Sequence, residues 1–182
     1  YHDLVKASRF KKVFYDLLLT TKESYYYFPT AWLHSASFAK AIYTTIENVH
    51  NDFFANKERL SRKERTLFIE HVYTQIIIFI MCYSQVSSMN ITCKAGIDRA
   101  GLELTKLIYS LNLFTETPLD NKHKRYLVHL PGYLARNRAM KLLRRYTLQN
   151  VLASYNPAVV SRLKKRYQDH HYKFNVEHDL SL

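Results

Sequence analysis

The scarcity of glycine and proline constrains the fold of this chain more than any other feature of its sequence. Only three glycines and four prolines occur in 182 residues. Turns should therefore be few and the regular elements long. Apolar residues recur at helical spacing in six stretches, namely 4–19, 31–54, 61–85, 98–114, 136–155 and 157–167. The pattern predicts a mostly helical chain.

Two of these stretches carry signals for a helix start. Pro29 stands near the start of 31–54, and Ser61 with Glu64 three residues later is a capping-box pattern. The later part of 61–85 is apolar on nearly all sides, so we expect it to be buried. The longest apolar run, Ile76 to Cys82, has seven residues and is too short to cross a bilayer.

Positive charge is concentrated in the second half of the chain. Residues 1–90 hold 11 Lys/Arg and 8 Asp/Glu, whereas residues 91–182 hold 16 and 7. From Asn121 to Gln168 there are twelve basic residues and no acidic one. Such a stretch favours an anionic partner, either phospholipid, nucleic acid or polyphosphate, although it is also typical of a solvated helix face. Residues 136–155 are expected to form a basic amphipathic helix with Leu143 and Val151 on one side.

The two cysteines have different neighbours. They are too few for a disulfide framework or a four-ligand zinc site, and the nine histidines show no metal-binding spacing. We therefore expect no metal and no cofactor. Cys82 lies in an apolar run and is interpreted as a core residue. Cys93 precedes small residues and is interpreted as a reactive thiol.

The sequence around Cys93 predicts a phosphate-binding loop. Residues 87–92 are expected to form a short strand, 93–96 a loop, and 98–114 a helix. Backbone N–H groups and the positive end of the helix dipole would then meet at one point, where they bind phosphate and stabilise a thiolate. Arg99 is placed to grip two phosphate oxygens, and Gly96 allows the backbone to approach closely.

The fold class predicted from these patterns is α+β and predominantly helical. A small sheet supplies the strand that leads into the phosphate-binding loop and its helix, and residues 126–130 are a second candidate strand. We expect residues 1–182 to be a single phosphatase-like catalytic domain. Because the first residue is Tyr1 rather than Met, we expect the chain to be a fragment of a larger protein.

The run from Cys93 to Arg99, Cys-Lys-Ala-Gly-Ile-Asp-Arg, resembles the Cys-x5-Arg loop of the cysteine-dependent phosphatases. It is most similar to the lipid-directed branch, which includes the inositol polyphosphate 4-phosphatases and the bacterial effectors of the SopB/IpgD and Legionella SidF/SidP types. The similarity covers seven to nine residues. The composition, rich in Tyr, Asn, His and Lys, also resembles that of intracellular bacterial effectors.

The resemblance implies a catalytic mechanism through a phosphocysteine. Cys93 would attack phosphorus, Arg99 would stabilise the charge on the phosphoryl oxygens, and water would hydrolyse the intermediate. Asp98 is the nearest candidate for the general acid, and an Asp or Glu from another loop is the alternative. Lys94 would contact a second phosphate of the head group. The substrate-binding loop is completed by Ala95, Gly96 and Ile97.

Two positions depart from the family pattern. Ala100 stands where many relatives carry Ser or Thr, whose hydroxyl helps the sulfur leave, so turnover should be slower. Ile97 stands where SopB-like loops carry a second lysine, so one phosphate contact is missing. Basic residues of the second half are candidates to replace that contact or to hold a membrane surface: Lys122, Lys124, Arg125, Arg136, Arg138, Arg144 and Arg145.

The resemblance thus implies a phosphatidylinositol polyphosphate phosphatase, leaning toward the 3-phosphate. Its partner would be a phosphoinositide head group on an anionic membrane surface. It would be intracellular and peripheral to membranes or, as an effector, secreted by a bacterium into the host cytoplasm. Two alternatives remain close, a phosphotyrosine phosphatase and a weakly catalytic phosphoinositide-binding module. A nucleic-acid-binding protein ranks last, because no groove-reading or stacking motif is present.

Overall fold

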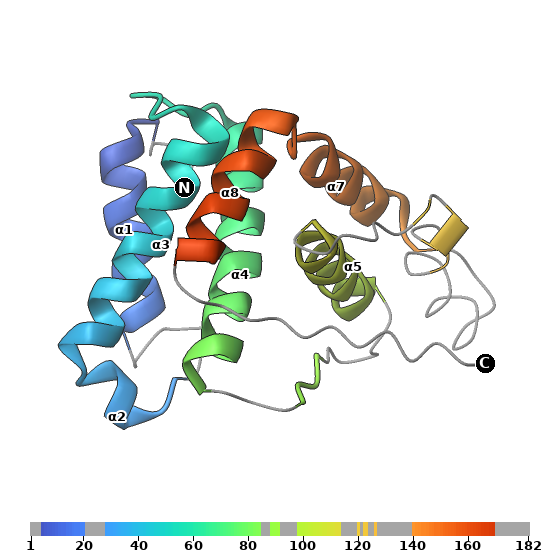
Figure 1. Ribbon diagram of the computed structural model, residues 1–182. Helices are drawn as coiled ribbons and strands as arrows, with labels where there is room; N and C mark the ends of the chain where they lie inside the picture. Colours follow the sequence, from blue (N-terminus) through green and yellow to red (C-terminus); the bar gives the residue numbers. More distant parts are fainter. Residues whose placement is uncertain are drawn as a thin grey trace. The chain divides into compact units, whose positions relative to one another are not determined.

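The computed structural model is built from helices (Figure 1). It describes residues 5–20, 28–84, 88–91, 98–113 and 140–169, together with positions 120, 122, 123 and 126. The helices are α1 (Ala7–Leu19), α2 (Thr30–Leu33), α3 (Ala36–Phe54), α4 (Arg62–Ser84), α5 (Asp98–Asn112), α7 (Leu142–Ala153) and α8 (Pro157–Asp169). The chain divides into two compact units, residues 1–76 and 77–182, and α4 runs through the boundary.

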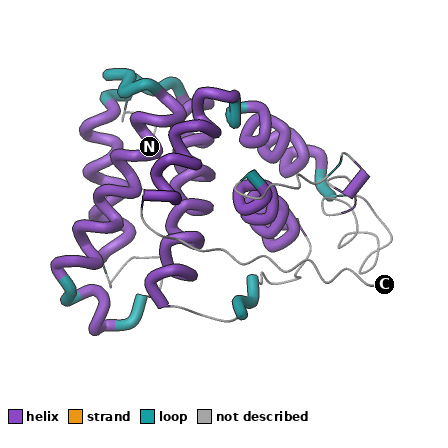
Figure 2. Tube along the Cα trace, in the orientation of Figure 1, coloured by secondary structure: helices purple, strands orange, loops and turns teal. Residues whose placement is uncertain are grey.

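The predicted small sheet is wrong for the part of the chain that the structure describes. Figure 2 shows helices and loops there and no strand. An isolated antiparallel bridge between Lys6 and Arg59 is the nearest approach to a ladder. Residues 88–91, expected as the strand before the loop, are irregular, and Ser88, Met89 and Asn90 are exposed. With three of these four residues exposed and Ile91 half-buried, the segment buries too little apolar surface to hold a strand in place. The predominantly helical character is confirmed.

The prediction of a second strand is also wrong at the one residue of it that the structure describes. It was expected over residues 126–130, and Tyr126 is helical. Residues 127–130 lie outside the described part of the chain.

An aromatic core holds the first unit together. Phe10, Phe14 and Leu18 recur at helical spacing on the buried side of α1. The Phe68 ring on α4 lies edge-on to the Phe10 ring, with centroids 5.4 Å apart, and 5.6 Å from the Phe54 ring at the end of α3. Edge-to-face aromatic pairs add about 0.5–1.5 kcal/mol beyond the area they bury. One phenylalanine thus joins α1, α3 and α4.

The long helix predicted over residues 31–54 is interrupted near its start. Ser35 has an extended backbone, with φ −86° and ψ 115°, and its Oγ accepts a hydrogen bond from the Phe38 N–H at 3.3 Å. This N-cap separates the one-turn α2 from α3, because a serine side chain satisfies an N–H that the helix itself leaves unpaired. The ring of Trp32 still packs on Phe38, with centroids 5.3 Å apart.

The predicted capping box at the start of α4 is confirmed. The Ser61 N–H donates to Glu64 Oε2 at 2.8 Å, and the Glu64 N–H donates to Ser61 Oγ at 3.2 Å. The predicted burial of the later part of this helix is wrong in degree. Ile78 is buried there, but its neighbours are half-buried and Tyr83 is exposed.

Among the described residues, α4 is the one helix long and apolar enough, by length and composition alone, to cross a membrane. An 18-residue window within it has the required hydropathy, although the run from Ile76 to Cys82 by itself is too short. In that window 39% of the residues are buried inside the protein. The first half of α4, around Phe68, belongs to the aromatic core described above.

In the second unit, α7 packs on α5 (Figure 1). Leu102 of α5 forms a small apolar cluster with Met140 and Leu148, and Leu152 packs against it. The turn into α8 uses Asn156, whose side-chain oxygen accepts the Val159 N–H at 3.0 Å. Pro157 then occupies the first helical position, where its missing N–H costs nothing.

Candidate functional site

The predicted phosphate-binding loop lies mostly outside the described part of the chain. Cys93, Lys94, Ala95, Gly96 and Ile97 belong to residues that the structure does not describe. What it does describe are the two flanks, residues 88–91 before the loop and α5 after it.

The helix expected after the loop is confirmed. It begins at Asp98, so that Asp98 and Arg99 occupy its first turn. Arg99 is exposed, whereas Ala100 and Gly101 are buried. Ala100 keeps only 6% of its surface exposed. A guanidinium exposed at a helix start is available to an anion in solution, and the helix dipole adds to its positive charge.

Two polar side chains of α5, Thr105 and Lys106, are buried. Thr105 Oγ1 donates to the Gly101 carbonyl at 2.7 Å. Lys106 is fully buried, and its ammonium lies 2.6 Å from the carboxylate of Glu103, one turn earlier. An ammonium enclosed in this way is engaged with a carboxylate inside the protein, so Lys106 acts in the structure and is not a surface contact for phosphate. Nothing in its sequence neighbourhood had singled it out.

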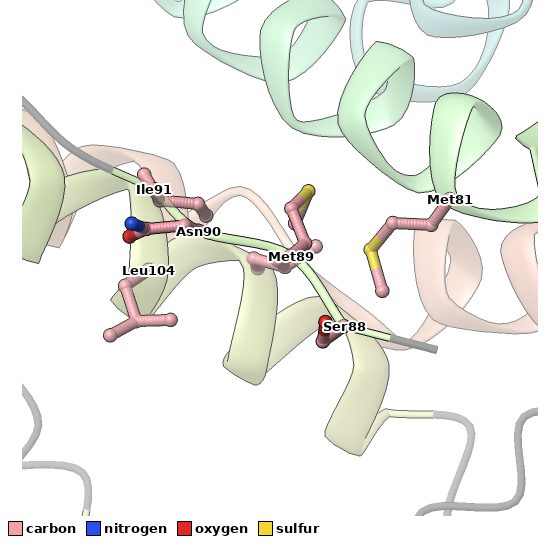
Figure 3. A pocket seen from close by; sticks show the side chains of 7 residues that line it. Met81, Ser88, Met89, Asn90, Ile91 and Leu104 are labelled. Atoms are coloured by element: carbon pink, nitrogen blue, oxygen red, sulfur yellow. The ribbon is translucent and has the colours of Figure 1, made fainter. Parts of the chain in front are cut away.

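A mostly apolar pocket of about 370 Å³ opens between the end of α4, the 88–91 segment and α5 (Figure 3). Met81 extends toward Ser88 and Met89, while Ile91 and Leu104 lie at the other end. The lining is completed by Asn90 and Leu107. Among the described residues that line this pocket there is no lysine or arginine, so they supply no positive charge for a phosphate.

Cys82, the other cysteine, behaves as an unreactive thiol. Burial raises its pKa to about 11, so the thiol stays protonated at neutral pH. It is free of any disulfide and half-buried rather than fully buried. The prediction that Cys82 is a core residue is wrong in degree, because the residue is half-buried and not part of the buried core.

The basic residues named from the sequence fall in three places. Lys122 is exposed, with its ammonium 5.9 Å from the centroid of the Tyr126 ring. Arg144 and Arg145 lie in the first turn of α7 and are half-buried. The remaining ones lie outside the described residues: Lys124, Arg125, Arg136 and Arg138.

Sequence reasoning missed the outward side of α7. The helix begins at Leu142 rather than near Arg136, and Leu143, expected on the same side as Val151, is exposed while Val151 is buried. At about 100° per residue, Leu143 and Val151 are about 80° apart, and the helix turns Val151 toward α5. The adjacent pair Leu142 and Leu143 could have indicated this exposed apolar side in the sequence. Leu148 and Val151 already fill the side of the helix that faces the core, so the pair is left outside it.

No group of three His, Cys, Asp or Glu side chains suited to a metal ion occurs among the described residues. One pairing of such groups is His123 with Asp120, whose Nδ1 and Oδ1 atoms lie 2.8 Å apart. Hydrogen bonds from the backbone N–H and the ring of His123 lower the pKa of Asp120. Two exposed ligands are too few for a structural metal site.

Comparison of the chain with family models, curated proteins and solved structures gave no match.

Proposed function

We propose that this chain is a cysteine-dependent phosphatase that acts on phosphatidylinositol polyphosphates, with the 3-phosphate as the first ring position to test. The proposal rests on the spacing of Cys93 and Arg99 in the sequence. The single structural observation that supports it is that α5 begins at Asp98 and leaves Arg99 exposed in its first turn. A helix start following a small-residue loop is the local arrangement that anion binding uses.

The reaction proceeds in two displacements. The Cys93 thiolate forms a bond to phosphorus, the bond from phosphorus to the inositol oxygen breaks, and Asp98 donates a proton to that oxygen. Arg99 stabilises the charge that develops on the phosphoryl oxygens. Water then attacks the phosphocysteine and gives a proton to the Asp98 carboxylate, while the bond from phosphorus to sulfur breaks, so that inorganic phosphate is released and the Cys93 thiolate and the Asp98 acid are restored. Lys94 holds a second phosphate on the ring, which favours a polyphosphorylated head group over phosphotyrosine.

Release of phosphate from short-chain phosphoinositides, measured beside a phosphotyrosine peptide, tests this proposal. Cys93→Ser should abolish release, and the matched variant Cys82→Ser should retain it, because the Cys82 thiol is protonated at neutral pH. Arg99→Lys keeps the charge but loses the two-pronged grip, so it should lower kcat by at least about tenfold, or about 1.4 kcal/mol. Release that survives Cys93→Ser would overturn the mechanism. Preference for the peptide would make the chain a phosphotyrosine phosphatase.

A phosphoinositide-binding module without turnover is the second candidate. Two observations favour it: residues 88–91 form no strand to support a catalytic loop, and Ala100 supplies no hydroxyl. This candidate predicts binding of a soluble phosphoinositide that depends on Arg99, with no phosphate released after long incubation. Titration calorimetry together with the release assay separates the two candidates.

A further inference from the structure

The outward side of α7 is the most exposed apolar surface among the described residues. Leu143 is 74% exposed, Leu142 61% and Tyr146 55%, more than any other large apolar side chain there. At about 100° per residue, these three side chains fall within an arc of about 100° on the helix. We call Leu142, Leu143 and Tyr146 the α7 outer face.

The α7 outer face is not needed for the core of its own unit. Leu148 and Val151 are buried on the other side of the helix, and Leu148 packs with Leu102 and Met140. The helix therefore has one apolar side covered and another left open. An exposed apolar patch beside charged residues is characteristic of a surface that meets a partner.

The charges around the α7 outer face identify the kind of partner. Lys141 is exposed next to it, and Arg144 and Arg145 lie between its members in the sequence. The sequence from Asn121 to Gln168 contains no acidic residue. A second copy of the chain would bring the same positive charges together, whereas anionic lipid would neutralise them.

We propose that the α7 outer face docks on an anionic lipid surface. Leu142 and Leu143 enter the boundary between head groups and acyl chains, and the Tyr146 ring lies at head-group level. Lys141, just before the helix, and Arg145, in its first turn, meet the lipid phosphates. This inference goes beyond the chemistry of Cys93 and does not rest on it.

Sedimentation of the full chain with vesicles tests the docking. The probe is phosphatidylcholine with about 30% phosphatidylserine, compared with phosphatidylcholine alone, so no phosphoinositide is present. The wild-type chain should bind the anionic vesicles, and the double variant Leu142→Gln/Leu143→Gln should bind at least about tenfold more weakly. Lys141→Gln/Arg145→Gln should also weaken binding, and so should raising the salt from 0.1 to 0.5 M. Tyr43→Gln, which alters an exposed aromatic residue on α3, is the matched control and should bind like wild type.

Tryptophan fluorescence measures how deeply a residue inserts into the vesicle. Trp32 is the only tryptophan in the sequence, so it is replaced first. In a Trp32→Phe background, Leu143→Trp should shift its emission to the blue on anionic vesicles and be quenched by brominated lipid. Tyr43→Trp in the same background should do neither. Circular dichroism of each variant establishes that it remains folded.

Three outcomes would overturn the proposal. One is wild-type binding that is equal on neutral and anionic vesicles, or absent from both. Another is a folded Leu142→Gln/Leu143→Gln variant that binds as tightly as wild type. The third is self-association without lipid that this variant abolishes, which would make the α7 outer face an interface between copies. Because Cys93→Ser should bind these vesicles normally, failure of the phosphatase proposal and failure of the docking proposal are distinguishable.

Discussion

The hydroxyl groups of Ser110 and Tyr155 lie 2.8 Å apart in the interior of the second unit, joining the last turn of α5 to the segment between α7 and α8. Ser110 Oγ also lies 2.8 Å from the Lys106 carbonyl, which only accepts hydrogen bonds. The single Ser110 proton therefore goes to that carbonyl, and Tyr155 donates to Ser110. Burial raises the pKa of Tyr155, so this donor keeps its proton at neutral pH.

Removing the Tyr155 hydroxyl should cost about 1 kcal/mol of unfolding free energy, because a buried hydrogen bond is lost while the ring packing on Tyr109 remains. Urea unfolding of Tyr155→Phe at neutral pH measures this loss. Ser110→Ala should cost a similar amount, and the double variant should cost less than the sum of the two. Tyr146→Phe removes an exposed hydroxyl and should leave stability unchanged. Additive costs for Tyr155→Phe and Ser110→Ala would show that the two hydroxyls are not coupled.

The capping box at the start of α4 should show in thermal unfolding. Ser61→Ala removes the oxygen that accepts the Glu64 N–H, so it should destabilise the protein by about 1 kcal/mol. Ser37→Ala, near the start of α3, is a suitable control. Ser37 is exposed and its hydroxyl lies 2.7 Å from the Ser35 hydroxyl, but the oxygen that accepts the Phe38 N–H belongs to Ser35, so this change should have a smaller effect. Equal losses in the two variants would contradict the assigned cap.

Glu64 should make stability depend on pH. A hydrogen bond from the Lys57 ammonium, followed by the backbone N–H of Ser61, lowers its pKa from 4.5 to about 2. A depressed carboxyl pKa stabilises the folded state above the unfolded value and loses that contribution as pH falls toward the folded one. The stability gap between wild type and Glu64→Gln should therefore be about 1 kcal/mol above pH 5 and close progressively toward pH 2, allowing for solvent screening. Urea unfolding at several pH values measures the gap. A gap that does not change with pH would assign its cause to packing instead.

Ala55 ends α3 in the left-handed region, with φ 50° and ψ 38°. A side chain with Cβ is strained there, whereas glycine is not, so Ala55→Gly should stabilise the protein by about 0.5–1 kcal/mol. The next residue, Asn56, has φ 54° and is a type that tolerates this conformation. Asn56→Gly should therefore gain less. Differential scanning calorimetry of the two variants gives the comparison, and a lower melting temperature for Ala55→Gly would contradict the assigned strain.

Helices were predictable from the sequence where their cause is local. The apolar spacing of Phe10, Phe14 and Leu18 and the Ser61 cap determine α1 and the start of α4, and both were anticipated. The break at Ser35 was missed, because one capping hydrogen bond does not interrupt an apolar pattern. The predicted strand is wrong over its described residues, 88–91, since a strand needs partners elsewhere in the chain and local composition does not supply them.

The features of the candidate site likewise separate into those that the local sequence determines and those that depend on the rest of the chain. The start of its helix at Asp98 and the exposure of Arg99 follow from local sequence. The conformation of the loop from Cys93 to Ile97 remains a prediction. The exposure of Leu143 depends on which side of α7 faces α5, and helical spacing alone places Leu143 and Val151 too close together to decide it.

Turnover by the proposed phosphatase should respond to Ala100. This residue is buried one position after Arg99, where many of the Cys-x5-Arg loops that this sequence resembles carry a hydroxyl that assists departure of the sulfur. A hydrogen bond to a charged group is worth about 1.5–3 kcal/mol, so Ala100→Ser should speed hydrolysis of the phosphocysteine by about tenfold or more. Rapid-quench kinetics separate this step from the first: the initial burst of leaving group should keep its rate while the steady-state rate rises. Cys93→Ser/Ala100→Ser should show neither burst nor turnover. A burst that slows in folded Ala100→Ser would mean that the added oxygen disturbs the loop. An unchanged steady-state rate would mean that hydrolysis of the phosphocysteine does not limit turnover.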